Sequence, residues 1–135
     1  MEIRPLKLEE IDKAYILFNK YSVEVGYVMK PSIREAVFQG NIIGAFEDKL
    51  IGVCKFNVRK KDKTLVIYEI AVDEEYRGKG IAREMIMTLL QICDRIMLKC
   101  PVDNESNYFY KKIGFKLKGV EKGRKRKLFI WVLTK

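Results

Sequence analysis

Residues 65–82 read LVIYEIAVDEEYRGKGIA, and they hold the most informative pattern in the chain. The first part, 65–72, is almost wholly apolar, which predicts a strand that is covered on both faces and lies centrally in a sheet. Residues 80–93 carry apolar side chains at helical spacing, and 96–100 is a further apolar run. We therefore expect a strand–helix–strand unit with a right-handed parallel crossover.

The rest of the chain fits one domain of mixed structure. Apolar patterns and turn residues predict strands at 2–6, 42–46, 50–58, 115–119 and 128–133, and helices at 8–21, 31–38 and 103–113. The order β-α-α-β-β-β-α-β-α-β-β indicates an α/β (α+β) fold with a mixed sheet and helices on both sides. A length of 135 residues suits a single domain over 1–135.

Composition limits the chemistry. No apolar run reaches the ~20 residues that span a bilayer, and no signal peptide is visible. The 3 cysteines are odd in number and widely spaced, which favours a reducing, cytoplasmic location. Histidine is absent, which excludes Ser-His and Cys-His catalysis and the commonest zinc ligand sets, so we expect no metal site. An acid or base must come from Glu, Asp, Tyr, Lys, Cys or water.

The segment between the central strand and the following helix, here called the glycine loop (residues 77–82), has the features of an anion site. The first turn of a helix has N–H groups without internal partners, and the helix dipole adds positive charge. Gly78 and Gly80 have no side chain to keep a phosphate away, and Ala82 is small. Three basic side chains can neutralise a pyrophosphate: Arg77, Lys79 and Arg83. A simple turn is the alternative explanation of the two glycines.

Three blocks resemble the GNAT N-acetyltransferase superfamily. RGKGIA at 77–82 resembles the family signature [Q/R]-x-x-G-x-[G/A], YEIAV at 68–72 resembles the strand before it, and FYKKIGF at 109–115 resembles a second conserved block. Residues 8–60 match no particular pattern. The resemblance implies the single-domain GNAT-like fold and an enzyme that transfers an acetyl group from acetyl-CoA to a primary amine by direct attack in a ternary complex.

The resemblance also implies where the cofactor lies. In the family, the strands at 65–72 and 96–100 splay apart at their ends, and the pantetheine arm of CoA enters the wedge between them and pairs with the strand backbone. The implied cofactor contacts are Ile70, Ala71, Val72, Arg77, Gly78, Lys79, Gly80, Ile81, Ala82 and Arg83. Asn104 and Asn107 are further candidates for the cofactor amides. The family often has Asn seven residues before the tyrosine, where this chain has Asp103, which we expect to cap a helix.

Two residues are candidates for proton transfer. Tyr110 matches the tyrosine that the family often uses as a general acid toward the leaving thiolate. A core aromatic with its hydroxyl on a backbone group is the alternative. Glu69 is the one charged residue in the apolar strand, and it can accept the proton of the amine directly or through water. The alternatives are a structural glutamate held by arginine or backbone donors and a glutamate that reaches solvent at the wedge.

Other functional assignments stay open. An acyl intermediate on Cys100 is disfavoured because no activating base is evident. Tyr27, Met29 and Phe46 are candidates for an acceptor pocket and equally for the core. Trp131 is predicted to pack or to contact a second copy, which leaves a homodimer open. The acceptor can be a free amino acid, a polyamine, an aminoglycoside or a protein N-terminus. The alternative to an enzyme is a non-catalytic acyl-CoA-binding or regulatory domain.

The net charge of +9 is concentrated near the end of the chain. Residues 116–127 hold seven Lys or Arg and one Glu, Glu121, a net +6. A solvated hairpin explains such a run. The alternative is a landing surface for a polyanion such as CoA, an acidic protein tail or RNA. Nucleic-acid binding is disfavoured because few aromatic residues interleave with the basic ones.

Overall fold

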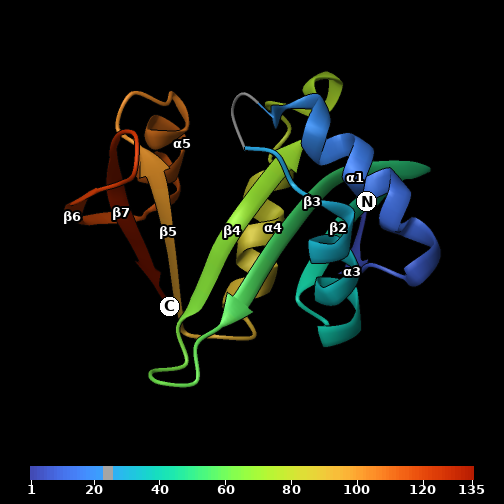
Figure 1. The fold of residues 1–135 in the computed structure, drawn as a ribbon, viewed down its shortest axis with the longest axis horizontal. Helices are drawn as coiled ribbons and strands as arrows, with labels where there is room; N and C mark the ends of the chain where they lie inside the picture. The colour runs from blue at the N-terminus through green and yellow to red at the C-terminus, as the bar shows by residue number, and fades with distance from the viewer. Residues whose placement is uncertain (23–25) are drawn as a thin grey trace.

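The computed structural model describes residues 1–22 and 26–135 (Figure 1). Within them, seven strands form one sheet in the order β1-β2-β3-β4-β5-β7-β6. The strands are β1 (Glu2–Pro5), β2 (Ile42–Glu47), β3 (Lys49–Val58), β4 (Leu65–Val72), β5 (Arg95–Pro101), β6 (Lys116–Lys122) and β7 (Lys127–Thr134). The helices are α1 (Ile11–Lys20), α3 (Lys30–Gln39), α4 (Ile81–Leu90) and α5 (Ser106–Ile113), with 3-10 turns η1 (Leu8–Glu10) and η2 (Glu74–Tyr76). None of the described helices is long and apolar enough to cross a membrane.

The predicted mixed sheet with helices on both sides is confirmed. β4 and β5 run parallel, and the other neighbouring strands are antiparallel. α1 and α3 pack on one face and α4 on the other, as Figure 1 shows. β4 contributes Ile67 and Val72 to the core under α4 and Ala71 to the core under α1 and α3. The nearly continuous apolar run of β4 therefore has the predicted cause, because apolar layers cover both of its faces.

Several element ends differ from the sequence prediction. The helix predicted over 8–21 is a 3-10 turn followed by α1, and α4 ends at Leu90. The helix predicted to begin at Asp103 begins at Ser106, because Asn104 Oδ1 accepts a hydrogen bond from the Ser106 N–H at 2.8 Å. Asp103 does not cap the helix, and its side chain is exposed. The basic segment 116–127 is a hairpin, with most of its length in β6.

The parallel pairing between β4 and β5 ends early. Residues Leu65–Ile67 pair with Ile96–Leu98, and no pairing follows toward the carboxyl ends. Each strand keeps its other neighbour, since β3 pairs with β4 to Val72 and β7 pairs with β5 to Pro101. The two strands therefore diverge (Figure 1), and the sheet opens at the carboxyl end of its parallel pair. Open α/β sheets place their ligands at such a point.

A β-bulge in β4 lies where the divergence begins. Glu69 pairs with Lys55 of β3, but Ile67 pairs with Phe56, so Tyr68 is an extra residue without a partner. A bulge bends the strand and changes the direction of its side chains. The sequence pattern did not indicate this bulge, because an apolar run with one polar residue looks the same with or without it.

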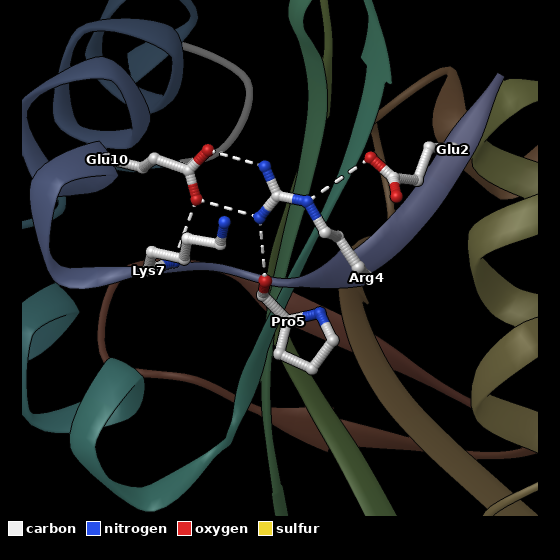
Figure 2. A network of polar contacts seen from close by, with 5 residues as sticks. All are labelled: Glu2, Arg4, Pro5, Lys7 and Glu10. Atoms are coloured by element: carbon white, nitrogen blue, oxygen red, sulfur yellow. Dashed lines mark hydrogen bonds and ion pairs between the residues drawn. The ribbon is translucent and has the colours of Figure 1, made fainter.

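An ion pair ties β1 to the first helical turn (Figure 2). Arg4 Nη1 and Nη2 donate to the two carboxylate oxygens of Glu10 at 2.9 and 2.7 Å, and the Lys7 N–H donates to Glu10 at 2.8 Å. The Arg4 guanidinium also lies 4.0 Å from the centroid of the Phe46 ring on β2. The hydrogen bonds from Arg4 lower the pKa of Glu10 to about 2.

We expect Glu10→Gln to lower the free energy of unfolding at pH 7 by about 1–2 kcal/mol, after allowance for solvent screening. The folded pKa of Glu10 lies below its ordinary value of 4.5, so this stabilisation is complete above pH 4.5 and is lost as the pH falls toward 2. Urea unfolding of both proteins at pH 7 and pH 3 measures this. Glu9→Gln, on an exposed side chain of the same turn, should change little. An equal loss in both variants would contradict the assignment.

Candidate active site

Two cavities lie where β4 and β5 diverge. The first, here called the loop cavity, measures about 290 Å³ and is bounded by the end of β4, the glycine loop and α5. The second, here called the wedge cavity, measures about 240 Å³ and is bounded by β4, β5 and the start of α5. Ile70, Ser106 and Tyr110 line both. The two cavities therefore meet at these three residues.

The backbone of the glycine loop is open for an anion. Gly78 and Gly80 have φ of +78° and +80°, a left-handed conformation that favours glycine, and a Cβ at either position would meet nothing within 4 Å. No side chain caps α4 at Gly80. Among the described residues, none accepts a hydrogen bond from the N–H groups of residues 78–83, and the Glu84 N–H is the first to bond back, to the Gly80 carbonyl. These N–H groups are available to an anion.

The basic side chains of the loop are directed differently from one another. Arg77 Nε donates to the Val72 carbonyl at 3.0 Å, and its guanidinium lies 4.5 Å from the Tyr21 ring centroid. This gives Arg77 a structural role at the end of β4, although the residue also lines the loop cavity. Lys79 Nζ lies 5.2 Å from the Tyr76 ring centroid, and Arg83 is exposed. Neutralisation of a phosphate stays a prediction for Lys79 and Arg83.

The backbone of β4 presents donors to the gap. The Asp73 N–H donates to the Ile51 carbonyl on β3 at 2.8 Å. Backbone groups of successive residues in a strand point to alternate sides, so the N–H groups of Val72 and Ile70 point away from β3. Since β5 no longer pairs here, these donors face the gap.

Tyr110 combines burial with access to both cavities. Its side chain is 8% exposed, and its ring meets Phe109 and Phe115 edge-on at centroid distances of 5.5 and 5.6 Å. The hydroxyl forms no hydrogen bond within the described part of the chain, so the backbone partner weighed as an alternative is absent there. Burial raises the pKa of the Tyr110 phenol. The phenol therefore keeps its proton at neutral pH.

Glu69 has a partner that the sequence analysis missed. Lys55 Nζ donates to Glu69 Oε1 at 3.2 Å, and the side chains are 13% and 22% exposed. Glu69 lines the wedge cavity. The partner is a lysine rather than the arginine or backbone donors considered beforehand. Lys55 is the one charged residue in 50–58, so the signal that singled out Glu69 would also have found it.

The two asparagines serve the protein itself. Asn107 Nδ2 donates to the carbonyls of Pro101 and Asn104 at 2.8 Å each, and its Oδ1 accepts from the Trp131 indole N–H at 2.8 Å. Both amide hydrogens of Asn107 are thus engaged within the described chain, and it lines neither cavity, so its contact with a cofactor amide stays a prediction. Asn104 lines the wedge cavity, but its Oδ1 is engaged with Ser106.

The remaining candidates have clear positions. Cys100 lines the wedge cavity, and burial raises the pKa of its thiol to about 11, so it is not a thiolate at neutral pH. Trp131 is buried in the core, in agreement with packing, the first of the two roles predicted for it. Tyr27 and Met29 are mostly exposed, Phe46 lies under Arg4, and none of these three lines either cavity.

Comparison with known proteins identifies related sequences and folds. A family profile described as the acetyltransferase (GNAT) family matches residues 8–115. No curated protein sequence matches the chain. A GNAT-family acetyltransferase from Streptococcus agalactiae has a similar structure, with a TM-score of 0.85 and 16% identity over 99% of this chain and 95% of that one.

Two other similar structures are of proteins named for their acetyltransferase activity. The PaiA N-acetyltransferase from Thermoplasma acidophilum, solved in complex with coenzyme A, has a TM-score of 0.82 and 20% identity, with 99% of this chain and 98% of that one covered. The ribosomal-protein-S18-alanine N-acetyltransferase from Escherichia coli has a TM-score of 0.75 and 15% identity, with 98% and 92% covered. At these identities the similarity establishes the fold and leaves the acceptor open.

We expect Gly80→Ala to weaken CoA binding at least tenfold while the protein stays folded. A left-handed alanine costs about 1 kcal/mol, and its methyl group would occupy space beside the free N–H groups. Gly40→Ala is the matched control, since Gly40 also has positive φ (+72°) and open space but ends α3, away from the loop. Calorimetric titration with CoA measures both. Equal affinities in the two variants would show that the glycine loop does not hold the phosphates.

Proposed function

The chain belongs to the GNAT acetyltransferase family, and from that membership we propose that it transfers an acetyl group from acetyl-CoA to a primary amine by direct attack in a ternary complex. The observation that carries this proposal is the meeting of the loop cavity and the wedge cavity at Ile70, Ser106 and Tyr110. Direct transfer requires that two substrates reach one point from separate sites. The loop cavity suits the cofactor, and the wedge cavity suits the amine.

The residues of the loop cavity fit CoA. The free N–H groups of residues 78–83 and the open space beside both glycines suit a pyrophosphate. Lys79, within the glycine loop, and Arg83, directly after it, add positive charge for the phosphates. The backbone of Ile70 and Val72 offers donors along the gap, which suits the amide groups of a pantetheine arm. Acetyl-CoA supplies the acetyl group as a thioester, and its thiol is the leaving group.

The donors of β4 also support catalysis. A backbone N–H that points to a reacting carbonyl stabilises the negative charge that develops on its oxygen. We assign this role to the N–H at Val72, with the N–H of Ile70 as its neighbour along the strand. Both are fixed by the β3–β4 pairing, so they need no reorganisation during the reaction.

Tyr110 is the proposed general acid. It is buried, it lines both cavities, and its hydroxyl is free of partners in the described part of the chain. The phenol is protonated throughout the neutral range, since burial raises its pKa above an ordinary value already well over 7. It therefore has a proton to give to the departing thiolate. Ser106 lies one helical turn away on the same face of α5.

Glu69 is the proposed acceptor of the amine proton, directly or through water. An amine attacks only after it loses a proton, and Glu69 is the carboxylate among the described residues that line the wedge cavity. The Lys55 ammonium at 3.2 Å keeps a positive charge beside it and holds its position at the bulge. Lys55 donates to one carboxylate oxygen of Glu69, so the other oxygen can accept a hydrogen bond from the protonated amine.

Two measurements separate this enzyme from a non-catalytic acyl-CoA-binding domain. Native mass spectrometry of the purified protein tests for bound CoA, and a thiol-release assay with a panel of amines tests for turnover. Thiol release that depends on an amine supports transfer. Bound CoA without thiol release from any amine would assign the chain to the binding class.

We expect Tyr110→Phe to lower kcat about 100-fold while leaving CoA affinity nearly unchanged, because a general acid contributes that order of rate enhancement. The phenyl ring keeps the contacts with Phe109 and Phe115. Tyr108→Phe is the matched control, since Tyr108 lies on the same helix and is 82% exposed. Thiol release under single-turnover conditions measures both variants. An unchanged rate in Tyr110→Phe would remove Tyr110 as the acid.

We expect Glu69→Gln to lower kcat/KM for the amine about tenfold or more at pH 7. The loss should shrink toward pH 9, because a larger share of the amine is then already deprotonated. Rates across this pH range measure the effect, and Glu35→Gln on the exposed surface of α3 is a control. A loss that is the same at both pH values would indicate a structural role for Glu69 through Lys55 instead of proton transfer.

A further inference from the structure

The β6–β7 hairpin borders the wedge cavity and carries most of the excess charge of the chain. Leu128 of β7 pairs with Pro101 at the end of β5, and the Val102 N–H donates to the Lys127 carbonyl. Arg126, in the turn of the hairpin, lines the wedge cavity together with Lys99. A molecule that enters this cavity therefore meets the hairpin next.

The charges at the rim of the cavity are paired, but weakly. Lys99 pairs with Glu121 at 2.8 Å, and Arg126 pairs with Asp103 at 3.6 Å. All four side chains are 41% exposed or more. Exposed pairs contribute little, so carboxylates of a ligand can replace Glu121 and Asp103 at small cost. The Lys55–Glu69 pair deeper in the cavity is far less exposed and is retained.

Beyond the rim, the positive charge is unbalanced. The other six basic residues of the hairpin form no ion pair with any described residue, and all are exposed: Lys116, Lys118, Lys122, Arg124, Lys125 and Lys127. β6 has seven residues, which corresponds to roughly 20 Å at about 3.3 Å per residue. This is longer than a small amine and comparable to an extended peptide.

We propose that the acceptor is a polypeptide whose free N-terminal amine is followed by Asp or Glu residues. This inference rests on the proposed acetyl transfer. The amine enters the wedge cavity beside Glu69, and the acidic residues that follow lie along the hairpin. An α-amine loses its proton more readily than a lysine side chain, so it needs less from a carboxylate that already holds Lys55. The positive charges of the hairpin attract an acidic peptide, whereas they repel a polyamine or an aminoglycoside.

The test uses six-residue peptides that begin with alanine and contain no lysine. In each peptide, three of the later positions carry the same residue, which is Asp in the first peptide, Asn in the second and Arg in the third. Thiol release gives kcat/KM for each peptide. We expect the Asp peptide to exceed the Asn peptide about tenfold at low salt, with the advantage falling as salt screens the charges. The Arg peptide should be the poorest.

Charge reversal locates the preference. The double variant Lys125→Glu, Arg126→Glu should lose the preference for the Asp peptide while its KM for acetyl-CoA stays within about twofold. The matched control is Lys60→Glu, Lys61→Glu, two exposed lysines in the turn between β3 and β4, at the opposite end of the sheet (Figure 1). This control should keep the preference.

Several outcomes would overturn the inference. Equal use of the Asp and Asn peptides, or turnover of small amines alone, would overturn it and leave acetyl transfer intact. A double variant that alters only the KM for acetyl-CoA would assign the hairpin to the cofactor. If the double variant lost binding to a single-stranded RNA but kept the peptide preference, the hairpin would be assigned to nucleic acid. Absence of thiol release with every amine would instead be the failure of the proposed function and of this inference together.

Discussion

The early end of the pairing between β4 and β5 is the constraint on which the site depends. Three residues of each strand pair, and the backbone donors of Ile70 and Val72 then face a gap. Unpaired backbone groups inside a sheet are costly unless something else binds them. The bulge at Tyr68 bends β4 at this point, and β7 holds β5 along its other edge. Both cavities exist because the sheet is kept open from both sides.

The features that the sequence predicted are local ones. The apolar run of 65–72 indicates burial on both faces, and the spacing of Gly78 and Gly80 indicates a turn that opens a helix. Both signals lie within a few residues and need no knowledge of partners. The bulge and the Lys55–Glu69 pair depend on the register between strands, which a single strand does not specify. The early end of the parallel pairing was implied by the family resemblance and not by the pattern of either strand. The predicted cap at Asp103 was wrong for a local reason, since the Ser106 N–H donates to Asn104 instead. The hydrogen bond that holds Asn107 was not predictable, because its donor, Trp131, lies 24 residues away in the sequence.

Charge acts in two different ways around the wedge cavity. Lys55 and Glu69 are mostly buried, so their attraction fixes geometry, and the removal of either would leave an uncompensated charge. The pairs Lys99–Glu121 and Arg126–Asp103 are exposed and exchange partners easily. The inner pair therefore suits a role in positioning the reaction, whereas the outer charges suit recognition of a ligand that varies. This division follows from exposure alone.

The position of α5 gives Asn107 a structural role within the described chain. A general acid must lie within hydrogen-bond reach of the leaving group, so the helix that carries it must be held in a fixed position. Asn104 fixes the first turn of α5 through Ser106, Asn107 joins that turn to the end of β5 and to Trp131 on β7, and Gly114 ends the helix with φ of +122°. Tyr110 lies one turn after Ser106, between these anchors. The residue that resembled a cofactor ligand thus supports the proposed acid, because it joins α5 to both strands on the far side of the gap.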